Sequence, residues 1–172
     1  LARQSGPERR RAFIEAMRDK GTRTMLVLTF LAVFVFAGLE ATFAMWTERK
    51  FGWGVMQNGY VFALLGLISA LIQGGLVGRL TRRFGELGLI RQGFVALAIG
   101  LALLPAADSL PFMMVALIVA TYGFSVVTPA LNSELSLGAS EDVRGGVLGL
   151  GRSASTLARA AGPAGAGYLF AF

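Results

Sequence analysis

The chain contains five apolar runs of roughly 20 residues, separated by short polar segments. A helix needs about 20 mostly apolar residues to cross a hydrocarbon core roughly 30 Å thick, so each run is long enough to span a bilayer. Lipid offers no hydrogen bonds to the backbone, and only helices and closed barrels satisfy their own. The runs predict an all-α membrane protein with five transmembrane helices, at about residues 24–47, 55–77, 87–105, 111–131 and 145–172.

Composition supports a lipid environment. Of the 172 residues, 55% are hydrophobic and 15% are charged, and the mean hydropathy is +0.64, unlike a typical soluble domain. The sequence has no Cys and no His, which excludes disulfides, Cys/His metal sites and histidine proton relays within it. We therefore expect no metal and no cofactor, and any proton chemistry must use a carboxylate.

The placement of the sixteen Lys and Arg residues argues against nucleic acid as a partner, although the net charge is +6. Most of these residues lie between the apolar runs and not on one soluble face. Seven precede the first span, and the loops expected on the same side carry Arg79, Arg82, Arg83 and Arg144. Only Arg49 and Lys50 lie in the loop expected on the other side. Because cytoplasmic loops carry the excess of basic residues, the N-terminal end is predicted to be cytoplasmic.

The two ends of the sequence suggest a longer protein. Residues 1–23 are basic around a small apolar stripe, which predicts either a helix lying on the membrane surface or an unstructured cytoplasmic linker. The chain starts with Leu and lacks a signal peptide, so we expect a cut end there. Transporters are commonly built from repeated halves, so an odd number of spans predicts that a sixth helix follows.

Residues 74–86, GGLVGRLTRRFGE, join the second and third spans and resemble the glycine and arginine loop of the major facilitator superfamily. The glycines of such a loop let two helices turn tightly and approach closely, while the arginines stay in water and face anionic lipid. The family pattern usually has an acid where this chain has Arg82. Any cytoplasmic turn favours Gly and Arg, which is the simpler explanation. The loop residues concerned are Gly75, Gly78, Arg79, Arg82, Arg83 and Gly85.

The last span, RGGVLGLGRSASTLARAAGPAGAGYLF, resembles the penultimate helix of the drug:proton antiporter branch of that family, which includes tetracycline-efflux-like transporters. The FGWG segment at 51–54 is also similar to this branch. Small residues let helices pack at backbone distance, and Pro163 permits a bend, so Gly162, Pro163 and Gly165 form the candidate bend motif. A generic packing helix is the alternative.

The resemblance implies a C-terminal-half fragment: five of six helices of one bundle in a twelve-helix transporter, with the N-terminal helix bundle of the same protein as its partner. It implies a multi-pass protein of the bacterial inner membrane that exports a small amphipathic organic compound in exchange for protons. A sugar or metabolite carrier of the same family, working by uniport or symport, is the nearest alternative. A membrane-embedded enzyme or a non-transporting scaffold is a more distant one, because the sequence lacks the clustered acids, His or metal site of such enzymes.

Two arginines interrupt the last span. Arg159 lies about 20 Å along the helix from its cytoplasmic end, near the bilayer centre, where a charge costs roughly 2.5–3.5 kcal/mol. Arg152, Ser155 and Thr156 share its face at helical spacing. We therefore predict a polar stripe that lines the central cavity; alternatively, Arg159 snorkels or pairs with another helix.

Glu40 is the single ionisable residue inside the first span. A buried carboxylate there would be able to bind and release a proton, as a proton-coupled antiporter requires. A structural ion pair or cap is an equal alternative, and exposure at the interface is the third.

Further polar and aromatic residues are candidates for contact with substrate. Gln73 shares a helix face with Ser69, and Tyr122, Ser125 and Asn132 fall on roughly one side of the fourth span. Such groups bind substrates, but they also join helices to one another. The aromatic candidates for a cavity wall, which alternatively pack or face lipid, are Phe43, Trp46, Phe62 and Phe124.

Overall fold

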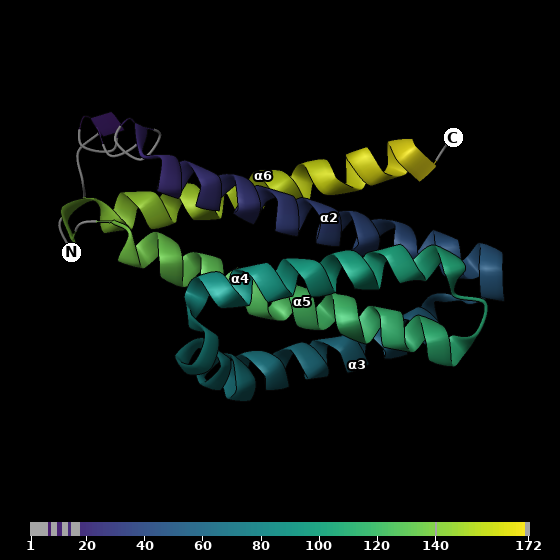
Figure 1. Ribbon diagram of the computed structural model, residues 1–172. Helices are drawn as coiled ribbons and strands as arrows, with labels where there is room; N and C mark the ends of the chain where they lie inside the picture. Colours follow the sequence, from purple (N-terminus) through teal and green to yellow (C-terminus); the bar gives the residue numbers. More distant parts are fainter. Residues whose placement is uncertain (1–6, 8–9, 12–13, 15–17, 140, 171–172) are drawn as a thin grey trace.

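The computed structural model describes residue 7, residues 10–11, residue 14, residues 18–139 and residues 141–170 (Figure 1). Every regular element among them is a helix, which confirms the all-α prediction. Most of the predicted surface helix or linker at 1–23 lies outside the described residues. The elements are α2 (Lys20–Phe51), α3 (Val55–Leu71), the π-helical turn η1 (Ile72–Leu76), α4 (Val77–Leu103), the 3₁₀ turn η2 (Leu104–Ala106), α5 (Leu110–Leu137) and α6 (Glu141–Phe170).

Three stretches of the described chain are long and apolar enough to cross a membrane: Lys20–Phe51, Val55–Ala106 and Leu110–Leu137. The middle stretch has 52 residues, about 78 Å of helix and more than twice the hydrocarbon thickness. It doubles back, so that α3 and α4 lie on opposite sides of α5, which contacts both (Figure 1). α6 does not meet the same criterion, because arginines and many glycines dilute its apolar residues.

The helices extend beyond the predicted spans. α2 begins four residues earlier than the predicted span and ends four later, and α5 continues six residues past its predicted end. Apolarity set the predicted limits, but a helix needs only its backbone hydrogen bonds to continue into the polar interface.

Gly85 is where the long middle stretch changes direction. Its φ of 70° and ψ of 169° interrupt α4, which therefore consists of a short helix at 77–84 and a long one at 86–103. Residues with a Cβ almost never adopt this conformation, so the loop needs glycine at this position.

Glycines also bring two pairs of helices to backbone distance. In the α4–α5 pair, a Cβ at Gly123 would overlap the backbone of Leu97, and a Cβ at Gly100 would overlap that of Ala120. In the α2–α6 pair, a Cβ at Gly162 would lie 2.6 Å from the carbonyl oxygen of Phe34. These contacts follow the small-residue packing that membrane helices use.

The bundle has one basic end, where α2 and α6 begin and where α5 and η1 end (Figure 1). Exposed arginines of the described chain gather there, including Arg23, Arg79, Arg82 and Arg83. At this end Asp19 caps α2: its carboxylate accepts a hydrogen bond from the Thr22 N–H at 2.6 Å. That bond holds the pKa of the Asp19 carboxyl below its usual value.

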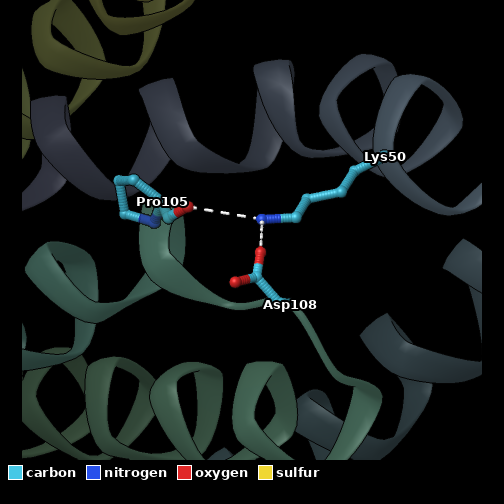
Figure 2. Close-up of polar contacts among 3 residues, drawn as sticks. All are labelled: Lys50, Pro105 and Asp108. Carbon is cyan, nitrogen blue, oxygen red and sulfur yellow. Dashed lines mark hydrogen bonds and ion pairs between the residues drawn. The ribbon is translucent and has the colours of Figure 1, made fainter.

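The opposite end is fastened by polar contacts and aromatic packing. Lys50 Nζ lies 2.8 Å from Asp108 Oδ1 and 3.4 Å from the carbonyl oxygen of Pro105, which ties the end of α2 to the link between η2 and α5 (Figure 2). Next to it, Thr47 donates a buried hydrogen bond of 2.9 Å to Asn58 on α3. Ring contacts continue along the α2–α3 turn through Trp46, Phe51 and Trp53.

Candidate functional site

A short polar chain joins α3 to α5 and extends to the exposed Gln73. Ser69 Oγ lies 2.7 Å from Ser125 Oγ, and Gln73 Nε2 donates to Ser69 at 3.0 Å. Ser125 is fully buried, so its hydroxyl would be costly to leave unpaired. Gln73 belongs to the π-helical turn η1, a distortion that often marks functional positions in helices. The predicted shared face of Ser69 and Gln73 is therefore present, and it contacts a third candidate, Ser125.

Next to this chain, α2, α3 and α5 enclose a cavity of about 400 Å³. Its polar lining comes from Glu40, Ser69 and Thr121. Three of the four predicted aromatic residues line it together with a fourth ring that the sequence analysis missed: Phe43, Phe62, Phe124 and Phe36. Phe36 and Phe124 stack face to face with ring centroids 4.0 Å apart. Trp46, the remaining predicted aromatic, lines a different cavity.

Glu40 lines this cavity yet remains exposed to solvent. Its carboxylate makes no ion pair or hydrogen bond within the described part of the chain. The described residues therefore neither bury the Glu40 carboxylate nor form an ion pair with it, although the sequence had suggested both possibilities. The side chain stands at the edge of an aromatic-walled cavity, where a molecule in the cavity would contact it.

A second cavity, of about 480 Å³, lies between α5 and α6. It is lined by Asn132, Leu148, Arg152, Ser155 and Thr156, so the structure brings Asn132 to the predicted polar stripe of α6. Ser155 and Thr156 donate their hydroxyl hydrogens to backbone carbonyls one turn earlier. The side chains free to donate to a ligand here are therefore those of Asn132 and Arg152.

Arg159 does not line either of these cavities, but it lies on the same edge of α6 as Arg152, seven residues away. Its side chain is exposed, and it makes no hydrogen bond or ion pair with any other described residue. α2 and α6 run parallel, with Gly38 against Gly162. Glu40 therefore lies about 8 Å nearer the opposite end than Arg159.

Tyr122 lies apart from the two residues with which it was grouped. It packs against the buried cluster around Leu89, Val126 and Leu131, whereas Ser125 contacts α3 and Asn132 faces α6. Three residues on roughly one side of α5 meet three different neighbours, because α5 is the most enclosed helix of the bundle. These three residues do not form a single site in the described chain.

The loop motif has one conformationally special glycine. Gly85 supplies the break in α4, but a Cβ at Gly75 or Gly78 would meet nothing within 4 Å among the described residues. Those two glycines therefore do not mark a close helix contact. Arg79, Arg82 and Arg83 are exposed at the basic end, as a water-facing loop requires.

The predicted bend motif of α6 is a packing surface. Gly162 and Gly165 face Phe34 of α2, and a Cβ at Gly165 would lie 2.7 Å from the Phe34 ring. Pro163 is exposed, and α6 continues through it to Phe170. A third cavity, of about 380 Å³, adjoins this contact between α2, η2 and α6 and has almost entirely apolar walls. No group of three acidic side chains in the described chain could hold a metal ion.

Comparisons with known proteins agree with this architecture. The sequence pattern of the Major Facilitator Superfamily matches residues 2–163. The chain is 34% identical over 146 residues to human major facilitator superfamily domain-containing protein 10, covering 85% of this chain and 32% of that protein. It is 32% identical over 149 residues to the class D tetracycline resistance protein of Salmonella ordonez, covering 86% of this chain and 36% of that one.

A solved structure shares the fold. The crystal structure of the human organic anion transporter MFSD10 (TETRAN) matches with a TM-score of 0.73 at 34% identity, over 83% of this chain and 33% of that one. The chain thus spans about a third of the length of these relatives. The family predicted from the loop at 74–86 and from the last helix is confirmed, and the chain belongs to the Major Facilitator Superfamily.

Proposed function

We propose that the full-length protein moves a small amphipathic organic compound across a membrane in exchange for protons, by alternating access between two helix bundles. The observation that carries the proposal is the cavity between α2, α3 and α5, where the Glu40 carboxylate stands beside aromatic walls. Aromatic surfaces with a few polar groups are typical of sites for small organic molecules. A carboxylate inside a membrane span is a functional candidate by default.

The proposed topology has five spans from this chain. α3 and the long part of α4 form two of them on either side of Gly85. α6 forms the fifth, with its polar stripe of Arg152, Ser155, Thr156 and Arg159 turned away from lipid. The basic end faces the cytoplasm, because its loops carry most of the Lys and Arg residues. The chain then supplies most of the C-terminal bundle, whose partner is the N-terminal bundle. A bacterial inner membrane as the location is part of the same proposal.

In the proposed mechanism Glu40 alternates between protonated and ionised forms as the cavity opens to each side. An ionised carboxylate is costly in a low-dielectric cavity unless water or a partner stabilises it. Substrate that occupies the aromatic walls removes that water, so substrate and the proton state of Glu40 influence one another. This linkage is what converts a proton gradient into transport.

The test measures substrate-dependent proton flux in proteoliposomes that contain the full-length protein. Tetracycline, taken from the name of one relative, serves as the first probe. The Glu40→Gln variant cannot exchange a proton, so we expect it to lose tetracycline-driven proton flux while it still binds tetracycline. Glu48→Gln is the matched control, because Glu48 is exposed in the last turns of α2 and does not line the cavity.

Two results would contradict the proposal. Proton flux that is unchanged in the Glu40→Gln variant would remove Glu40 from the coupling. Proton movement together with the substrate, or transport without any proton movement, would identify a symporter or a uniporter, the alternatives expected for a sugar or metabolite carrier.

A further inference from the structure

Thr121 of α5 has a buried hydroxyl group that no other described residue satisfies. The residue is 3% exposed, and it lines the cavity between α2, α3 and α5. Its side chain makes no hydrogen bond within the described part of the chain. By contrast, Thr29, Thr42 and Thr128 each donate to a carbonyl oxygen one turn earlier in their helices. A hydroxyl without a hydrogen bond is costly to bury, so the partner of Thr121 must come from what the cavity holds.

Thr121 and Glu40 lie at the same depth on two helices that contact one another. α2 and α5 are antiparallel, and Lys50 pairs with Asp108 at the end of the bundle where α2 ends and α5 begins. Glu40 lies eleven residues before the end of α2, and Thr121 lies eleven residues after the start of α5. Each residue is therefore about 16 Å from that end, measured along its own helix.

The stacked rings of Phe36 and Phe124 connect these two polar residues. The ring centroids are 4.0 Å apart, and both rings line the cavity. Glu40 follows Phe36 by four residues and Thr121 precedes Phe124 by three, so each lies one helical turn from the ring pair, toward the same end of the bundle. A carboxylate and a hydroxyl without a partner thus border one cavity from two neighbouring helices, beside the same aromatic wall.

The two polar groups together select the kind of ligand group that can pair with both. An ionised carboxylate only accepts hydrogen bonds, whereas a threonine hydroxyl both donates and accepts. A hydroxyl on a bound molecule donates to Glu40 and accepts from Thr121. An ammonium ion only donates, so the hydrogen of Thr121 would still lack an acceptor, and a ligand carbonyl offers nothing to the carboxylate. The third polar side chain of the lining, Ser69, already bonds with Ser125 and Gln73.

From this arrangement we propose that Thr121 binds substrate, and that the substrate carries a hydroxyl group on an apolar, ring-containing body. The hydroxyl accepts a hydrogen bond from Thr121 and donates one to Glu40, while the ring lies against the wall formed by Phe36 and Phe124. The inference rests on the proposed transport function and adds a specificity-determining residue and the chemical class of the substrate. A site that hydrogen-bonds a hydroxyl rejects an analogue without it, because the polar groups of the site are then left unpaired.

The test is a binding measurement on the full-length protein in nanodiscs, without a proton gradient, so it does not depend on coupled transport. The probes are 2-naphthol and 2-methylnaphthalene, which carry a hydroxyl or a methyl group on the same ring system, and uptake by empty nanodiscs is subtracted. The Thr121→Val variant keeps the shape of the side chain and removes its hydroxyl. We expect it to bind 2-naphthol about fivefold more weakly and 2-methylnaphthalene with unchanged affinity.

Matched variants control for the loss of a hydroxyl as such. Thr121→Ser keeps a hydroxyl at the same position and should keep most of the affinity for 2-naphthol. Thr128→Val removes a hydroxyl that bonds to the backbone of the same helix and does not line the cavity, so both affinities should stay unchanged. Glu40→Gln keeps a carbonyl oxygen as acceptor and should still bind 2-naphthol, whereas Glu40→Leu should bind it at least about fivefold more weakly.

Protein stability separates a binding role from a structural one. Because the Thr121 hydroxyl has no partner in the described chain, Thr121→Val should unfold at the same SDS concentration as the wild-type protein, or at a higher one. Lower stability of Thr121→Val, with an equal loss of affinity for both probes, would assign a packing role to Thr121 and overturn the inference.

Other binding results would also overturn it. These are equal affinity of the wild-type protein for both probes, no binding of 2-naphthol, or full 2-naphthol affinity in a folded Thr121→Val variant. Tighter binding of the cationic 2-naphthylmethylammonium than of 2-naphthol, unaffected by Thr121→Val, would identify an organic cation as the ligand instead. Unchanged proton flux in Glu40→Gln would refute the coupling proposed above but would leave the hydroxyl preference intact, so the two proposals fail separately.

Discussion

Replacing Gly123 with Ala should weaken the bundle at the contact between α4 and α5. The added Cβ would lie 2.5 Å from the carbonyl oxygen of Gly93 and would overlap the backbone of Leu97. Backbone cannot rotate out of the way as a side chain can, so the helices must separate by about 1 Å to restore ordinary contact. Such a gap forfeits a quarter to a half of each affected dispersion contact.

Overpacking of this kind costs about 1–3 kcal/mol. Alanine is also favoured over glycine in a helix by about 0.8–1.0 kcal/mol, and the matched control Gly59→Ala gains the same amount. A Cβ at Gly59 meets nothing within 4 Å among the described residues, so only Gly123→Ala pays the packing penalty.

The assay is unfolding of the full-length protein by SDS in mixed micelles, followed by tryptophan fluorescence. We expect the Gly123→Ala variant to have a free energy of unfolding about 1–3 kcal/mol below that of Gly59→Ala. Equal free energies for the two variants would show that α4 and α5 do not pack at backbone distance in the membrane.

Three further predictions concern other contacts. Gly85→Ala should destabilise the loop by about 1–3 kcal/mol, because the φ of 70° and ψ of 169° at this position are strained for alanine. Limited proteolysis at the basic end should therefore increase, and an unchanged rate of proteolysis would contradict the turn geometry. Ser125→Ala should cost about 0.6–1.7 kcal/mol of unfolding free energy, because it removes the contact to Ser69. A double-mutant cycle with Ser69→Ala measures the coupling energy between the two hydroxyls, and a value near zero would contradict this contact. Asp108→Asn should cost at most about 1 kcal/mol, because Asp108 is 89% exposed while it pairs with Lys50, and the effect should vanish at high salt; a salt-independent loss would mean that the ion pair is not its cause.

Helix type and approximate position were predictable because the lipid solvent imposes a strong rule on length and apolarity. The five predicted apolar runs correspond to helices of the structure, and the turn at Gly85 falls between two of them. The glycine contacts were only partly predictable. Gly162 and Gly165 were recognised as packing residues, whereas Gly93, Gly100 and Gly123 were missed, although Gly93 and Gly100 are seven residues apart on one helix face.

For the candidate site, the sequence predicted contacts within one helix but not contacts between helices. Spacing along a single helix correctly grouped Ser69 with Gln73 and placed Arg152 beside Thr156. It could not show that Ser125 would turn toward α3 and Asn132 toward α6, because that depends on which helices surround α5. The Lys50 and Asp108 pair joins residues 58 positions apart, and no local pattern indicates it.

The central claim is that the polar edge of α6, formed by Arg152, Ser155, Thr156 and Arg159, faces water inside the transporter. Its apolar edge, with Leu157 and Tyr168, faces lipid. The sequence has no Cys, so single cysteines can be introduced at Thr156, Arg159 and Leu157, in a full-length protein whose cysteines elsewhere are replaced. A membrane-impermeant thiol reagent should label Thr156→Cys and Arg159→Cys, and substrate should protect both, while Leu157→Cys should stay unlabelled. Equal labelling on both edges, or labelling of Leu157→Cys alone, would contradict the account.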